Sequence, residues 1–121
     1  KIKTVMPSAS LARYEWRKHG TCSGLTQQDY FDTLLAAFNA IRVPENFRSP
    51  HQTVTVAPNA VEAAFVRSNP GLKPAGIAVV CDKRYLGEVR ICLNKDLSFR
   101  ECREVDRRAC RSRSAEMPPV N

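Results

Sequence analysis

The sequence lacks any apolar run close to the roughly 18 residues that are needed to span a membrane. Histidine is scarce, with two among 121 residues, and no Cys-x-x-Cys pair occurs, so a zinc site is weakly supported. Repeats, low-complexity tracts and long polar segments are absent as well. These absences exclude membrane-spanning, repeat and disordered proteins, and they favour a single domain over residues 1–121 in which 112–121 form a loose tail.

The first residues, Lys1 to Pro7, contain no apolar segment after their charges, so they do not form a signal peptide. We expect either that a signal has been removed or that the chain begins inside a larger protein.

Acidic residues are outnumbered, because 12 Asp and Glu stand against 19 Lys and Arg, which gives a net charge of +7. Between Lys83 and Arg113 the imbalance is strongest, with ten cations against five acids. This pattern favours a polyanionic partner, with nucleic acid ahead of an anionic membrane. A cationic surface that only improves solubility is an equally good interpretation of the charge alone.

The five cysteines divide into Cys22, which stands alone, and four that lie near the C-terminus with 10, 9 and 7 residues between neighbours. Four clustered cysteines in a short cationic chain favour two disulfides and an oxidising compartment. Three pairings are possible. The nested pairing, Cys81–Cys110 around Cys92–Cys102, would join a hairpin to the tail. Reduced, buried cysteines are the alternative.

Three segments have helical patterns. The first runs from about Ser8 to Lys18, and the second has Thr26 as its N-cap with Asp29 as the acidic partner of a capping-box-like start. A third helix is predicted over 58–68. The second helix has a stripe of apolar positions that favours a core role: Tyr30, Phe31, Leu34, Leu35, Phe38 and Ile41.

Strand patterns follow the helices. Residues 77–81 are rich in β-branched residues, which favours a buried strand. In residues 86–93, two sets of side chains alternate along the chain, which predicts a second strand. Residues 99–102 are a candidate third strand. Residues 53–56 are either a short strand or the lead into the next helix, and 42–52 are predicted to be a loop. Helices followed by an antiparallel hairpin predict an α+β fold in which helices pack on a mostly antiparallel sheet.

The first predicted helix carries the groups that phosphodiester cleavage needs. Glu15, Lys18 and His19 stand at positions i, i+3 and i+4, so their side chains share one face. Histidine can act as base or acid near neutral pH, and Lys18 can stabilise added negative charge. Gly20 can end the helix in a left-handed conformation, and Cys22 can fasten that end covalently. For this triplet alone, an ordinary exposed Glu–His helix pair is the alternative.

Residues 15–23, Glu-Trp-Arg-Lys-His-Gly-Thr-Cys-Ser, resemble the second active-site motif of the ribonuclease T2 family, which usually reads His-Glu-Trp-x-Lys-His-Gly-Thr-Cys. The match misses only the first position, where Tyr14 stands. The resemblance continues, as in bacterial members, through 22–25 and the helix with Tyr30. It also includes 87–93 with the surrounding cysteines, and so extends over most of the chain.

The resemblance implies a ribonuclease T2 fold and cleavage of single-stranded RNA through a 2′,3′-cyclic phosphate that is then hydrolysed, without a metal or other cofactor. It implies that His19 is one of two histidines that exchange protons with the 2′-oxygen and the 5′-leaving oxygen. It also implies that Glu15 and Lys18 engage the phosphate.

Tyr14 replaces a histidine that helps to bind phosphate in the family. Its hydroxyl can still donate a hydrogen bond to phosphate, and plain packing is the alternative. Trp16 could line a substrate pocket, although a core position is favoured. The family's earlier motif, His-Gly-Leu-Trp-Pro, supplies the other catalytic histidine and does not occur in this sequence. His51, in a predicted loop, is a weak substitute.

In the family, the motif cysteine pairs with a cysteine of the upstream half, so the resemblance implies that the partner of Cys22 is not in this sequence. We therefore expect the chain to be the C-terminal portion of a larger ribonuclease T2-like domain, secreted or periplasmic, that acts fully with its own N-terminal half. RNA is the expected partner, with neither a membrane nor a metal. The alternative is a catalytically inactive, basic RNA-binding or interaction module that is stabilised by disulfides.

Overall fold

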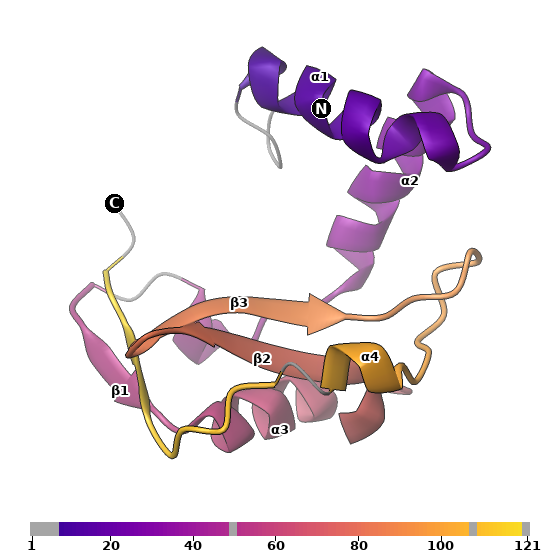
Figure 1. Cartoon of the computed structure of the whole chain (residues 1–121). Helices are drawn as coiled ribbons and strands as arrows, with labels where there is room; N and C mark the ends of the chain where they lie inside the picture. The colour runs from indigo at the N-terminus through magenta and orange to yellow at the C-terminus, as the bar shows by residue number, and fades with distance from the viewer. Residues whose placement is uncertain (1–7, 49–50, 107–108, 120–121) are drawn as a thin grey trace. The chain divides into compact units, whose positions relative to one another are not determined.

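The structure is a computed structural model that describes residues 8–48, 51–106 and 109–119 (Figure 1). The chain divides into two compact units, Lys1–Ile41 and Arg42–Asn121, which are described one at a time. None of the helices in the described ranges is long and apolar enough to cross a membrane.

The first unit contains two helices, α1 (Ala9–Lys18) and α2 (Gln27–Ala40). Hydroxyl side chains begin both helices: the Leu11 amide donates to Ser8 Oγ over 3.3 Å, and the Asp29 amide donates to Thr26 Oγ1 over 3.1 Å. Such N-caps satisfy amide groups that have no partner within the helix. The structure confirms both predicted helices and the predicted cap at Thr26.

The end of α1 differs from the expectation. Gly20 does not adopt a left-handed conformation; the glycines with positive φ in the described part of the chain are Gly24 and Gly71. Instead, Gly20 begins a short 3₁₀ turn, η2 (Gly20–Cys22), and is itself buried. A Cβ on Gly20 would lie 2.7 Å from Cζ3 and 2.9 Å from Cδ2 of Trp16. Glycine is therefore required here because the indole of Trp16 lies against the backbone.

The second unit is built on a four-stranded mixed sheet with the strand order β1-β4-β3-β2. The strands are β1 (Val54–Val56), β2 (Ile77–Asp82), β3 (Tyr85–Ile91) and β4 (Ala115–Met117). Pairs β1–β4 and β2–β3 are antiparallel, whereas β3 and β4 are parallel. Helices with a mostly antiparallel sheet confirm the predicted α+β class.

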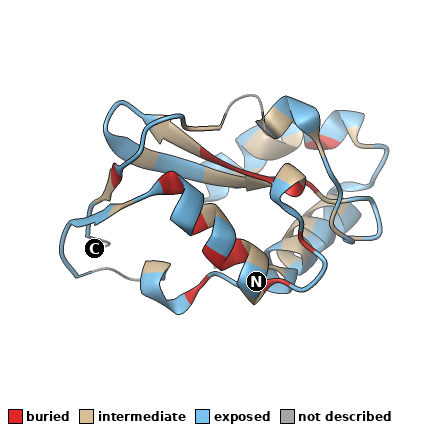
Figure 2. Ribbon diagram, turned by 90° about the horizontal axis from the view of Figure 1, so that it is seen from below, coloured by how far each residue is buried: buried red, intermediate tan, exposed pale blue. Residues whose placement is uncertain are grey.

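Helix α3 (Pro58–Ser68) confirms the third predicted helix and provides one side of the core. Its Val61 and Phe65 are buried, as are Ile77 and Val79 of β2, and Figure 2 shows buried stretches along both elements. The Phe65 ring also stacks on that of Phe47, with 6.4 Å between ring centroids. The core of this unit thus lies between α3 and the first half of β2.

Asn69 is the buried polar residue of this core and is 2% exposed. Its Oδ1 accepts from the Arg42 amide over 2.7 Å, and its Nδ2 donates to the carbonyls of Arg42 and Phe65 over 2.8 and 2.9 Å. One side chain therefore joins the start of the second unit to the end of α3.

Strand β2 is held on both sides. On one side it pairs with β3. On the other side, the Val79 amide donates to Glu62 Oε1 over 3.2 Å, and the Val79 carbonyl accepts from the Cys110 amide over 2.6 Å.

Two disulfides join the C-terminal region to the hairpin. Cys81 is bonded to Cys110, with 5.2 Å between their Cα atoms, and Cys92 is bonded to Cys102, with 6.3 Å. This is the nested pairing among the three that the sequence allows.

Several elements differ from the sequence-based expectation. The predicted loop 42–52 contains a short 3₁₀ turn, η3 (Glu45–Phe47), and 99–102 form no strand, because only Phe99 bridges to Leu93. A short helix, α4 (Arg103–Asp106), was not predicted. Strand β4 lies within 112–121, which were expected to be loose; residues 120–121 are outside the described part.

Candidate active site

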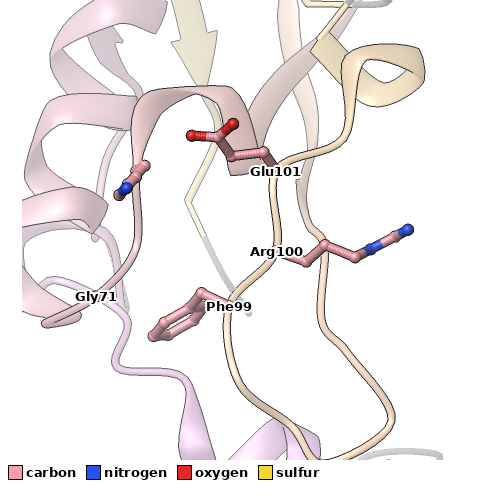
Figure 3. A pocket seen from close by; sticks show the side chains of 5 residues that line it. Gly71, Phe99, Arg100 and Glu101 are labelled. Carbon is pink, nitrogen blue, oxygen red and sulfur yellow. The ribbon is translucent and has the colours of Figure 1, made fainter.

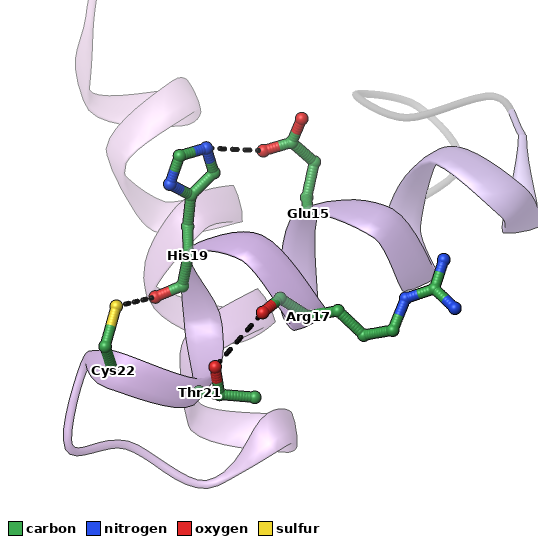
Figure 4. A network of polar contacts seen from close by, with 5 residues as sticks. All are labelled: Glu15, Arg17, His19, Thr21 and Cys22. Atoms are coloured by element: carbon green, nitrogen blue, oxygen red, sulfur yellow. Dashed lines mark hydrogen bonds and ion pairs between the residues drawn. The ribbon is translucent and has the colours of Figure 1, made fainter.

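The last turn of α1 brings Glu15 and His19 together (Figure 4). Oε2 of Glu15 lies 3.6 Å from Nε2 of His19, and the side chains are 27% and 55% exposed. One helical turn separates the two residues, which is the spacing at which side chains meet on a helix. The imidazole is therefore open to solvent, while the carboxylate beside it is more buried.

Lys18 and Tyr14 form a second pair at the same spacing. The Nζ atom of Lys18 lies 5.6 Å from the centroid of the Tyr14 ring, within the range of a cation–π contact. Both residues are exposed. The four predicted residues at the end of α1 thus form two pairs at the i, i+4 spacing, Tyr14 with Lys18 and Glu15 with His19.

The turn after His19 is closed by local hydrogen bonds (Figure 4). Cys22 Sγ donates to the His19 carbonyl over 3.2 Å, and Thr21 Oγ1 donates to the Arg17 carbonyl over 3.1 Å. Ser23 Oγ donates to the Gly20 carbonyl over 2.5 Å. Cys22 is a free, exposed cysteine here, so in this structure hydrogen bonds rather than a disulfide hold the end of α1.

Trp16 is half-buried and is engaged within its own unit. Its ring meets that of Tyr30 edge to face, with 5.6 Å between centroids, and its indole lies over Gly20. These contacts pack Trp16 within its own unit.

Tyr30 is the residue that the sequence analysis missed as part of this site. Burial raises the pKa of Tyr30, and the charges of Glu15 and Cys22 raise it further. Its ring lies 5.6 Å from that of Trp16, the residue that follows Glu15. The sequence offered one signal, a tyrosine in an otherwise apolar stripe, but that stripe alone predicted only packing.

The second unit holds the other histidine and a small pocket. His51 is exposed on a bend before β1. Residues around Gly71 and Phe99 enclose a pocket of about 130 Å³ that Lys73, Arg100 and Glu101 also line. Figure 3 shows the Arg100 side chain directed away from the Phe99 ring. No residue predicted for the site lines this pocket.

Metal ligation has no obvious location among the residues that the structure describes, because they contain no group of three or more His, Cys, Asp or Glu side chains that could hold an ion. The groups that could do chemistry on α1 are therefore an imidazole, a carboxylate, an ammonium and a phenol.

Comparison with known proteins matches residues 2–102 to the Ribonuclease T2 family. Ribonuclease I of Escherichia coli (strain K12) is 31% identical over 104 residues, which are 79% of this chain and 39% of that protein. A ribonuclease of Aeromonas hydrophila is 35% identical over 94 residues, which are 74% of this chain and 43% of that protein. No solved structure matches the chain. The chain spans about two fifths of these relatives and, by its match over residues 2–102, belongs to the ribonuclease T2 family.

Proposed function

We propose that this chain carries half of the active site of a metal-independent endoribonuclease that cleaves single-stranded RNA through a 2′,3′-cyclic phosphate. The observation that carries the proposal is the Glu15–His19 pair, 3.6 Å apart on an accessible helix end, within a chain of the ribonuclease T2 family. The two relatives are both named ribonucleases, which supports the same chemistry.

In the proposed reaction, the ribose 2′-oxygen attacks the adjacent phosphorus and loses its proton to a base. The bond from phosphorus to the 5′-oxygen breaks, and that oxygen receives a proton from an acid. His19 supplies one of these two transfers, because an imidazole can serve either way near neutral pH. Glu15, whose Oε2 lies 3.6 Å from His19 Nε2, holds the ring in place.

The second proton transfer needs a second group of suitable acidity. The family motif His-Gly-Leu-Trp-Pro is not among the 121 residues of this sequence. We propose that a complementary polypeptide segment carries this histidine and that its cysteine pairs with the exposed Cys22.

Charge develops on the phosphate oxygens as the 2′-oxygen bonds to phosphorus. Lys18, one position before His19, is the cation that stabilises this charge in the proposed site. Tyr14 donates a hydrogen bond to the same phosphate in place of the histidine that the family usually has there. Because these groups are supplied by side chains, we propose that neither a metal nor another cofactor takes part.

The overall charge and the disulfides support the proposed substrate and location. A net charge of +7 favours association with a polyanion such as RNA. Two disulfides indicate an oxidising compartment, so we propose that the protein is periplasmic or secreted.

The test uses the protein as its gene encodes it, with an RNA dinucleotide as substrate and the 2′,3′-cyclic phosphate as the measured product. His19→Ala is expected to lower kcat by about 10²- to 10⁴-fold, the usual size of a proton-transfer contribution. His51→Ala is the matched control and should retain activity, and a chelator such as EDTA should have no effect. Near-normal turnover by His19→Ala would overturn the proposal.

A second candidate is an RNA-binding module without catalysis. It is favoured by the high positive charge together with a single histidine in the candidate site. Under this alternative, the unaltered protein binds RNA in a salt-dependent manner and forms no cyclic phosphate from the dinucleotide.

A further inference from the structure

The position of His19 depends on how α1 ends. The helix continues hydrogen bonding up to His19, whose amide donates to the Glu15 carbonyl over 2.9 Å. At the next residue the chain turns into η2, and this turn places the Gly20 backbone directly under the Trp16 indole. The indole of Trp16 therefore lies against the backbone at the point where the chain leaves α1.

The indole is in turn held by α2. Tyr30 meets Trp16 edge to face, with 5.6 Å between centroids and 64° between ring planes. Tyr30 also contacts its neighbour Phe31 edge to face, at 5.2 Å and 76°. Edge-to-face aromatic contacts have a preferred geometry, so they fix orientation as well as burying area. A line of contacts thus runs from α2 through Trp16 to the residue after His19.

Charged and titratable groups surround this line within the first unit. Glu15 and Lys18 belong to α1, His19 is the C-cap of that helix, Cys22 belongs to η2, and Tyr30 belongs to α2. The raised pKa of Tyr30 has burial as its first cause and Glu15 and Cys22 as further causes. Tyr30 therefore keeps its proton at neutral pH, and its ring lies against Trp16, the residue that follows Glu15.

We propose that Tyr30 is a positioning residue for His19: its ring holds Trp16 on Gly20 and thereby keeps the imidazole at the end of α1 against Glu15. The proposal rests on the proposed function for its consequence in catalysis. Its structural content, the orientation of His19, can be measured without any activity.

The activity-independent test compares the rates at which diethylpyrocarbonate modifies the two histidines, with mass spectrometry as the readout. His51 serves as an internal reference in every variant. Tyr30→Leu is expected to raise the His19:His51 ratio, because the imidazole is released from Glu15, whereas Tyr30→Phe retains the ring and should leave the ratio unchanged. The emission of Trp16, the single tryptophan, should shift in Tyr30→Leu alone.

The catalytic test uses the dinucleotide assay on the same variants. Tyr30→Leu is expected to lower kcat by roughly 10- to 100-fold, the cost of misplacing a catalytic group by about 1 Å, with KM little changed. Tyr30→Phe, which keeps the ring, should have the kcat of the unaltered protein. Phe38→Leu is the matched control, because Phe38 is an aromatic residue of the same helix that is 54% exposed.

An unchanged His19:His51 ratio in a folded Tyr30→Leu protein overturns the proposal, whatever the activity. A changed ratio in a protein that never forms cyclic phosphate supports the positioning role while contradicting the proposed function. If Tyr30→Leu does not fold, Trp16→Phe replaces it, because this variant alters the same line of contacts from the other side. A changed ratio in Trp16→Phe supports the proposal, and an unchanged ratio overturns it.

Discussion

At the scale of single residues, Asn69 shows how a buried amide can replace secondary structure as the link between segments. Its two side-chain groups satisfy both the amide and the carbonyl of Arg42, and they also reach the Phe65 carbonyl. A buried amide without partners is costly, so these hydrogen bonds are what allow the Asn69 side chain to lie in the core.

We predict that Asn69→Ala destabilises the protein by about 2–4 kcal/mol, because three hydrogen bonds that each contribute about 1 kcal/mol are lost. Urea unfolding followed by circular dichroism measures the change. Asn59→Ala is the matched control, since Asn59 is an exposed asparagine of the same helix. Equal stability of the two variants would contradict the role of Asn69.

Asp96 gives a prediction for acid stability. The Ser98 hydroxyl and, second, the Ser98 amide donate to its carboxylate and lower its pKa, over distances of 2.5 and 3.0 Å. Because the pKa is lower in the folded state, the stabilisation is present above the usual pKa of about 3.9 and is lost as pH falls through the lowered value. The Ser98 amide resonance should therefore move in this acidic window, and Asp96→Asn should abolish the movement.

At the scale of elements, the corner between α1 and η2 depends on the absence of a side chain at Gly20. The predicted left-handed helix stop is wrong, and contact with Trp16 explains the glycine instead. Trp16 and Gly20 are four residues apart, which puts them on one helical face, so the sequence did contain a signal for this contact.

We predict that Gly20→Ala costs about 1–3 kcal/mol through overpacking and shifts the Trp16 emission. Gly24→Ala provides a contrast, because a Cβ on Gly24 would meet nothing within 4 Å while its φ of 80° is unfavourable for alanine. Gly24→Ala should therefore lose about 1–2 kcal/mol without a change in emission. Identical spectra for both variants would contradict the contact.

The helices and strands that could be predicted from the sequence are marked by residues within the element or at its start. Helices α1 and α2 have hydroxyl N-caps, α3 starts with a proline, and β2 and β3 are long enough to show a pattern. Strand β4, in contrast, has three residues and exists through its pairing with β1 and β3. No local pattern distinguishes such a short strand from a loop, because its partners are distant in sequence.

The residues of the candidate site also divide into those that a local sequence pattern predicts and those that it does not. Glu15, Lys18 and His19 could be predicted because their spacing within one helix fixes their relative positions. Tyr30 could not, because its relation to Trp16 depends on how two helices pack. The apolar stripe of α2 was predicted as core, yet none of its residues is fully buried.

At the scale of the whole molecule, the state of the five cysteines can be tested by chemical labelling. In the structure, Cys22 is free and exposed, while the other four cysteines form two disulfides. The Cys81–Cys110 bond joins residues 29 apart, and closing a loop of this size stabilises a protein by roughly 3–4 kcal/mol.

We predict that the 121-residue chain labels with one equivalent of a thiol reagent before reduction, at Cys22, and with five equivalents after reduction and denaturation. Peptide mapping by mass spectrometry should recover the Cys81–Cys110 and Cys92–Cys102 peptides. Labelling of Cys92 or Cys102 without reductant would contradict the pairing.

Strand β2 has a further consequence for the behaviour of the protein at high concentration. An open sheet border can recruit a strand from another molecule and so start fibril growth. Here Glu62 and Cys110 occupy the amide and carbonyl of Val79 on that border. Cys110 is held in place by its disulfide to Cys81, which belongs to β2 as well. Loss of that disulfide would therefore free the Val79 carbonyl from its hydrogen bond to the Cys110 amide. Oxidation therefore protects the molecule against self-association as well as against unfolding.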